Sequence, residues 1–159
     1  MIFMSAFSLT NAFSQKGDVY FAGTPQCYEK LEVSLEVLIE GDRITAVLDC
    51  KNNTGFDIYV PDHYINIFDD HEEERMATNN YFLVYNQHNE IAEYFGFGTK
   101  YGHSIKHSIL LKNGDSLTIT IDHLEKIYCI PKGTTTLFVS YYSTIAPPSN
   151  TVQVGYINN

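Results

Sequence analysis

Side chains of the kinds that bind metal ions are concentrated in one acidic stretch, residues 62–74. Carboxylates and imidazoles together can hold a divalent cation. The stretch has no Asp-x-Asp-x-Asp-Gly pattern, so it lacks the glycine turn that wraps oxygen ligands around Ca²⁺. Consecutive charges are typical of a solvated loop instead. We therefore predict no metal site and no cofactor, although the stretch contains Asp62, His63, Asp69, Asp70, His71, Glu72, Glu73 and Glu74.

A second pair of possible ligands, His103 and His107, lies where the sequence predicts strand or loop. Four strand residues span about 13 Å, which is too far for both imidazoles to reach one ion. The sequence also lacks the local patterns Gly-x-Ser-x-Gly, His-Glu-x-x-His and the phosphate loop. We predict no catalytic residues and a protein that is not an enzyme. A metal-assisted hydrolase built on the acidic stretch is the least favoured alternative.

Aromatic side chains offer another route to function, because the chain has 12 Tyr and 10 Phe but no Trp. Tyrosine combines a large contact area with one polar end, which suits protein or sugar surfaces. Tyrosine is also common on strands for reasons of packing alone. The tyrosines that could line one face are Tyr81, Tyr85, Tyr94, Tyr101, Tyr141 and Tyr142. With the loops 64–80 and 96–107 included, the candidate binding residues are Tyr64, His71, Phe97, Tyr101, Tyr141 and Tyr142.

Three cysteines, Cys27, Cys50 and Cys129, allow at most one internal disulfide. Cys50 continues the apolar face of a predicted strand, where a free cysteine packs like a small hydrophobic side chain. Neither Cys50 nor Cys129 lies in the basic surroundings typical of a reactive thiol. Cys27 and Cys129 are therefore the pair we expect to form a disulfide if the protein is exported.

Composition and charge predict a single folded domain and exclude two classes of partner. A chain of 159 residues can bury a sizeable core. The net charge of −9, with no basic stripe, argues against nucleic acid and against an anionic membrane surface. Residues 1–15 are uncharged, and they are too short to span a bilayer.

Residues 1–15 match the apolar and cleavage regions of a secretory signal peptide, although no Lys or Arg precedes the apolar run. An apolar strand or a disordered tail is the alternative. From the signal peptide we expect export to the periplasm or the extracellular space and no membrane insertion after signal removal. The domain then covers residues 16–159.

Hydrophobic alternation predicts two β-hairpins. Residues 31–39 and 44–50 alternate with period two, and the Gly41-Asp42 pair between them is a hairpin signal. Residues 109–111 and 116–121 flank Asn113-Gly114, which predicts a second hairpin.

A polar corner at residues 52–55 separates the strand at 44–50 from a second strand at 56–60. Asn and Gly let the chain reverse there, and Pro61 ends the second strand because it has no N–H to donate. Further short strands are expected at 18–22, 64–68, 81–85, 91–95, 134–142 and 151–157. Roughly eight to ten short strands without a long helix predict an all-β antiparallel sandwich or barrel.

The order of these pieces resembles bacterial extracytoplasmic immunoglobulin-like β-sandwich domains, including the BsuPI-type proteinase-inhibitor sandwich. The likeness is carried by the Asn-x-Thr-Gly corner, FDIYVP, YFLVY, LLKNGDSLTI and PKGTTTLFVSYY. It covers about two-thirds of the chain and implies a fold, with no site residue to transfer. We expect a non-enzymatic inhibitor, adhesion or accessory module with a protein partner. A carbohydrate or small-molecule binder is the second hypothesis.

Overall fold

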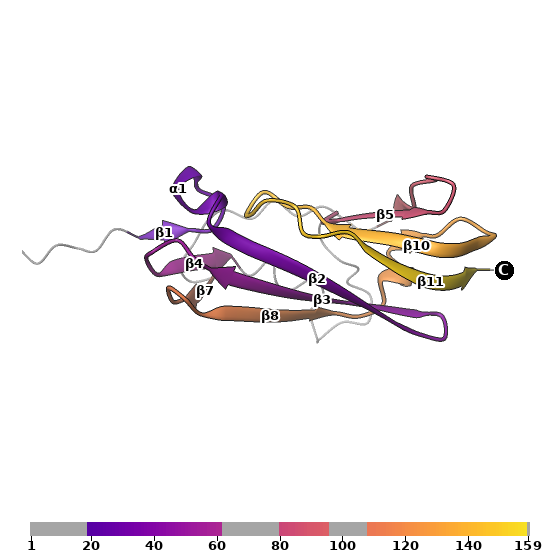
Figure 1. Ribbon diagram of the computed structural model, residues 1–159, viewed down its shortest axis with the longest axis horizontal. Coiled ribbons are helices and arrows are strands. Elements are labelled where there is room, and N and C mark those ends of the chain that lie inside the picture. Colours follow the sequence, from indigo (N-terminus) through magenta and orange to yellow (C-terminus); the bar gives the residue numbers. More distant parts are fainter. Residues whose placement is uncertain (1–18, 62–79, 96–107, 159) are drawn as a thin grey trace, which may run out of the picture.

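The computed structural model describes residues 19–61, 80–95 and 108–158, and these residues are mostly in strands (Figure 1). The helices described are short: α1 (Pro25–Tyr28) and the 3₁₀ helix η3 (Leu124–Lys126). The strands are β1 (Tyr20–Phe21), β2 (Leu31–Glu40), β3 (Arg43–Asn52), β4 (Ile58–Pro61), β5 (Phe82–Asn86), β6 (Glu93–Tyr94), β7 (Ser108–Leu111), β8 (Ser116–Ile121), β9 (Tyr128–Cys129), β10 (Thr134–Tyr141) and β11 (Val152–Asn158).

The described strands form four sheets, in the orders β1-β4-β7, β2-β3-β8, β11-β10-β5 and β6-β9. All pairings are antiparallel except β1 with β4, which is parallel. The all-β prediction is therefore confirmed, with one parallel pair that the sequence did not indicate. The predicted strand at 64–68 lies outside the described residues.

The first predicted hairpin is confirmed over its whole length. β2 pairs with β3 from Leu31↔Asn52 to Glu40↔Arg43, so Gly41 and Asp42 form the two-residue turn. Gly41 has φ +66°, a conformation that a side chain would disfavour. The face predicted to be apolar is the buried one, because Ile44, Ala46, Leu48 and Cys50 are all in the core.

The larger core cluster lies between the inner faces of the β2-β3-β8 and β11-β10-β5 sheets. From the first sheet it receives Leu35, Val37, Leu48 and Ile121, and from the second Phe82, Val84, Leu137, Val139 and Tyr141. A smaller cluster lies around the β1-β4-β7 sheet and consists of Ala22, Cys27, Leu31, Ile58, Val60, Leu111, Ile145 and Ala146. The two clusters give each of these three sheets one buried face.

The predicted polar corner carries the chain from one sheet to another, because β3 and β4 belong to different sheets. Asn52, the last residue of β3, is fully buried. Both polar atoms of its side chain form hydrogen bonds that brace the corner. Its Nδ2 donates to the carbonyls of Phe56 (3.0 Å) and Leu111 (2.9 Å). Its Oδ1 accepts from the backbone N–H (3.0 Å) and the hydroxyl (2.7 Å) of Thr54. One amide thus joins the end of β3 to the start of β4 and the end of β7.

The second predicted hairpin is wrong, because β7 pairs with β4 and β8 pairs with β3. The turn between them explains the difference. Asp115 N–H donates to Lys112 O (3.1 Å), and Gly114 has φ +84° while Asn113 has no positive φ. A positive φ at Gly114 alone matches a type II turn. A type I′ turn, which keeps two strands in one ladder, needs a positive φ at both residues.

The type II turn crosses between the same two sheets as the Asn52 corner, and the two turns are bonded together. Gly114 N–H donates to Asn52 O (2.8 Å). Gly55 N–H donates to Asn113 Oδ1 (2.9 Å), and Asn113 N–H donates to Asp57 Oδ1 (3.0 Å). We call this pair of bonded turns, residues 52–57 and 112–115, the double corner.

Replacing Asn52 by Ala is expected to lower the free energy of unfolding by roughly 2–4 kcal/mol, because the buried Leu111 carbonyl and the Thr54 N–H lose their partner and the Phe56 carbonyl keeps only the Thr54 hydroxyl. Asn52→Asp should be at least as damaging, since a carboxylate cannot donate to the Phe56 and Leu111 carbonyls. The measurement is chemical denaturation. Asn53→Ala is the matched control, because the Asn53 side chain is exposed. Equal stability of the Asn52 and Asn53 variants would contradict the assigned role of the brace.

Candidate functional site

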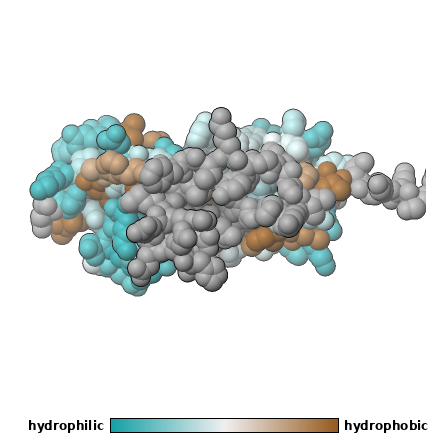
Figure 2. Space-filling view, turned by 180° about the vertical axis from the view of Figure 1, so that it is seen from behind, coloured by the Kyte–Doolittle hydropathy of each residue, from teal (hydrophilic) through white to brown (hydrophobic). Residues whose placement is uncertain are grey.

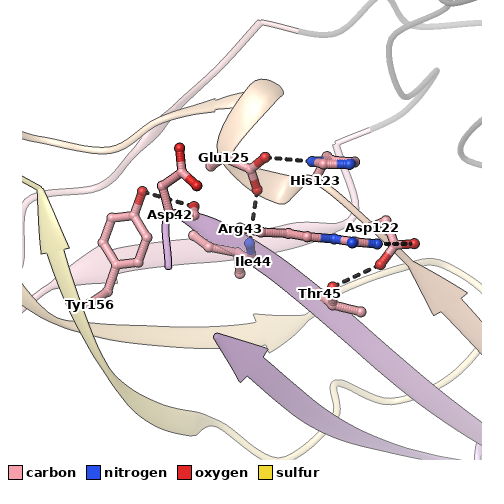
Figure 3. A network of polar contacts seen from close by, with 8 residues as sticks. All are labelled: Asp42, Arg43, Ile44, Thr45, Asp122, His123, Glu125 and Tyr156. Atoms are coloured by element: carbon pink, nitrogen blue, oxygen red, sulfur yellow. Dashed lines mark hydrogen bonds and ion pairs between the residues drawn. The ribbon is translucent and has the colours of Figure 1, made fainter. Parts of the chain in front are cut away.

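A network of polar contacts lies where β8 ends (Figure 3). The ladder between β3 and β8 stops at Ala46↔Ile121, and His123 turns the chain away with φ +63°, which is rare for a residue with a side chain. The N–H of Ile44 lies beyond the end of this ladder. It donates instead to Glu125 Oε2 (2.9 Å), so a carboxylate takes the place of a strand carbonyl.

The remaining contacts of the network join β11 to the β2–β3 turn and the end of β8 to β3. Glu125 Oε1 binds His123 Nδ1 (2.8 Å), and the hydroxyl of Tyr156 donates to Asp42 O (3.3 Å). Asp122 accepts from the Thr45 hydroxyl (2.7 Å) and pairs with Arg43 (2.8 Å). The Thr45 hydrogen bond, helped by Arg43, lowers the pKa of the Asp122 carboxyl. Burial raises the pKa of Tyr156, so its hydroxyl stays a donor.

The network contains the carboxylate–imidazole pair that orients a general base, but its geometry does not extend to a nucleophile. The Thr45 hydroxyl donates to Asp122 and not to His123. Both Glu125 oxygens are occupied, one of them by a backbone N–H. Arg43 Nε is buried without a hydrogen-bond partner, yet the guanidinium already pairs with Asp122. We therefore assign this network to closing the end of the sheet.

All three cysteines are free in the structure, so the disulfide predicted between Cys27 and Cys129 is not formed. Cys27 is buried in the smaller core cluster, where Thr24 Oγ1 donates to its sulfur (3.2 Å). Cys129 is exposed on β9, where it lies opposite Glu93. Cys129 is not part of the smaller core cluster. Cys50 is in the core as predicted, and burial, with the nearby Asp49 carboxylate, raises its thiol pKa to about 12.

The structure separates the candidate binding residues. Tyr141 was predicted as a surface residue, but it is fully buried and packs against Phe82 with ring centroids 5.5 Å apart. The reason is strand phase, since Tyr141 follows Leu137 and Val139 at period two. Tyr142 is in the opposite phase and is 65% exposed. Tyr64, His71, Phe97 and Tyr101 lie outside the described residues, as do His63, His103 and His107.

The outer face of the β2-β3-β8 sheet is polar. Its residues oppose one another in rows such as Glu32–Lys51–Ser116 and Ser34–Asp49–Thr118. Within the second row the Thr118 hydroxyl donates to Asp49 Oδ1 (3.1 Å). Leu38 and Val47 are the apolar side chains on this face. The side chains on this face are therefore mostly polar, as is usual for a surface in contact with water.

The outer face of the β11-β10-β5 sheet carries aliphatic and aromatic side chains beside the polar Thr136, Ser140 and Gln153. Ile91 forms an isolated bridge with Tyr85, Tyr85 opposes Phe138, and Phe138 opposes Gln153. These pairings place the side chains in one row across the sheet. Leu83 is 42% exposed, Ile91 67% and Ile157 72%. We call this surface the apolar face; its members are Leu83, Tyr85, Ile91, Phe138, Tyr142 and Ile157.

The rings of Tyr85 and Phe138 stack at the centre of the apolar face, with centroids 5.0 Å apart and planes 8° apart. Each ring thereby covers one face of the other. Beside them Gly155 opposes Thr136 and leaves open space, because a Cβ built there would meet nothing within 4 Å. Figure 2 shows hydrophobic side chains among hydrophilic ones at the end of the molecule that holds these strands, on the left in that view.

Tyr85 and Tyr142 were among the tyrosines predicted to line a possible face, whereas Leu83, Ile91, Phe138 and Ile157 were not predicted. The signal was present in YFLVY and TTTLFVSYY, where apolar residues occur in both strand phases. Such continuous runs are usual for strands buried on both faces. Here one phase is in the core, while the other is half-buried or exposed except at Ser140, which is a difference the sequence alone does not reveal.

A scan against protein-family models and a search of curated proteins both find no match for this sequence. None of the helices formed by the described residues is long and apolar enough to cross a membrane. Within the same residues, no group of three or more His, Cys, Asp or Glu side chains is placed to hold a metal ion. The acidic stretch at residues 62–74 lies outside the described residues.

Alkylation is expected to label Cys129 alone in the native protein, because Cys27 and Cys50 are buried. The Cys50 thiol is additionally protected by its raised pKa, since the thiolate is the reactive form. In denaturant without reductant, all three thiols should react, as read from the intact mass. If the denatured, non-reduced protein accepts a single label, Cys27 and Cys129 are paired after all and the free-thiol arrangement is contradicted.

Proposed function

We propose that the protein is a non-enzymatic binding module that contacts a protein partner through the apolar face. The observation that supports this most is the contrast between two sheets of one domain. The outer face of β2-β3-β8 is polar, whereas that of β11-β10-β5 exposes aliphatic and aromatic side chains in a row. Contiguous exposed apolar surface in a folded protein is typical of interaction sites.

The chemistry of the face favours a protein over a glycan. Sugars stack on free aromatic ring faces, but Tyr85 and Phe138 already cover one face of each other. Their neighbours Leu83, Ile91 and Ile157 are aliphatic, which suits apolar side chains of a partner. A carbohydrate or small-molecule ligand is the alternative function, favoured only by Gln153 and the open space at Gly155.

The charges beside the face indicate what kind of protein would bind. Ile91 is flanked along the chain by the exposed carboxylates of Glu90 and Glu93, and the whole chain carries −9. Complementary charge speeds encounter and disfavours wrong partners. We therefore infer a partner with an apolar patch rimmed by Lys or Arg.

The proposal also includes an immunoglobulin-like fold and export from the cytoplasm. An immunoglobulin-like sandwich is supported by the two sheets that share one core and by the resemblance to BsuPI-type and related extracytoplasmic domains. Export is supported by the uncharged apolar residues 1–15. A mature N-terminus at or near residue 15, after expression in a Gram-negative host, is the expected result. An unprocessed N-terminus on protein that stays in the cytoplasm would contradict export.

The binding face is tested with Ile91→Ser and Ile157→Ser, two truncations that should leave the fold intact because both side chains are mostly exposed. A partner retained by the immobilised wild-type protein from envelope and secreted fractions should bind the double variant at least about fivefold more weakly, since removing an apolar anchor typically costs more than 1 kcal/mol.

Leu38→Ser is the matched control, because Leu38 is 45% exposed and lies on the polar outer face of β2. It removes a similar aliphatic side chain and should leave binding unchanged. Equal loss of binding in the control and the double variant would contradict the proposed face. Binding to a glycan array that depends on Tyr85 and Phe138 would replace the protein partner by the alternative.

A further inference from the structure

We infer that Asn113 is a deamidation site, and that the double corner suppresses the reaction until the corner opens. Asn113-Gly114 is the one Asn-Gly pair in the sequence. Asparagine followed by glycine is the pair most prone to this chemistry, because glycine has no side chain to hinder ring closure. Both residues are exposed, so lack of water does not protect them.

The reaction needs the backbone nitrogen of Gly114 to attack Cγ of Asn113. A bond forms between that nitrogen and Cγ, the Cγ–Nδ2 bond breaks, and ammonia leaves with the proton that the Gly114 nitrogen gives up. The product is a five-membered succinimide. Water then opens either of its two carbonyls, which yields aspartate or isoaspartate at position 113.

Two hydrogen bonds hold the reacting groups away from this geometry. The Gly114 N–H donates to Asn52 O (2.8 Å), so the attacking nitrogen is engaged. The Asn113 side chain is turned toward the other corner, where its Oδ1 accepts from Gly55 N–H (2.9 Å). A third bond, from Asn113 N–H to Asp57 Oδ1 (3.0 Å), fixes the backbone of the turn. Ring closure therefore requires the double corner to open first.

The isoaspartate product would prevent the corner from closing again. It adds one methylene to the backbone between residues 113 and 114, inside the turn that is closed by Asp115 N–H and Lys112 O (3.1 Å). Either product also places a new carboxylate beside Asp57, which raises the local negative charge. The extent of modification at Asn113 thus reports the total time that the corner has spent open.

The test holds the full-length protein at mildly alkaline pH, native and in denaturant, and measures Asn, Asp and isoAsp at position 113 by peptide mapping. Deamidation should be at least about tenfold slower in the native protein, because an opening free energy of about 1.4 kcal/mol already reduces the open population tenfold. Equal rates in the native and the denatured protein would overturn the inference.

Asp57→Ala provides a second test, since Asp57 is exposed and its loss removes one bond of the double corner. The native variant should deamidate at Asn113 several-fold faster than the wild type and more slowly than the denatured chain. Glu36→Ala, which removes an exposed carboxylate from β2, is the matched control and should leave the rate unchanged. A rate for Asp57→Ala equal to that of the control would also contradict the inference.

Discussion

The side chain of Asn52 is the constraint on which the arrangement of the sheets depends. It is fully buried, so its two donors and its acceptor must be satisfied within the protein. They are satisfied by the start of β4, the end of β7 and Thr54 together. Because the backbone of Asn52 also bonds to Gly114 and Asp115, one residue sets where the chain leaves the β2-β3-β8 sheet and where it returns.

Local signals in the sequence predicted the parts of the fold that local geometry decides. Gly41-Asp42 specified a two-residue turn, and alternation over β2 and β3 specified which face is buried, so both were predictable. Asn113-Gly114 is an equally clear local signal, but the hairpin predicted from it is wrong. The partner of β8 is β3, which is far away in the sequence. The turn there serves a crossing between sheets, which depends on bonds to Asn52 and Asp57.

The candidate site was harder to predict than the fold, because it depends on which strand phase is covered. Tyr141 and Tyr142 are neighbours of the same residue type, yet one is in the core and the other at the surface. Pairing across strands then brings Ile91, Tyr85 and Phe138 into one row, although they are separated in sequence. The cysteines illustrate the same limit: elimination suggested Cys27 and Cys129, but the fold buries one and exposes the other.

The polar outer face of the β2-β3-β8 sheet and the apolar face of the β11-β10-β5 sheet together support the proposed binding module. Site-specific photo-cross-linking tests this directly, with a photoreactive residue placed at Ile91 on the apolar face or at Glu36 on the polar face, both exposed. In the native compartment, the Ile91 position should give a discrete adduct with a partner protein and the Glu36 position none. Adducts from Glu36 alone, or equal adducts from both positions, would contradict the account.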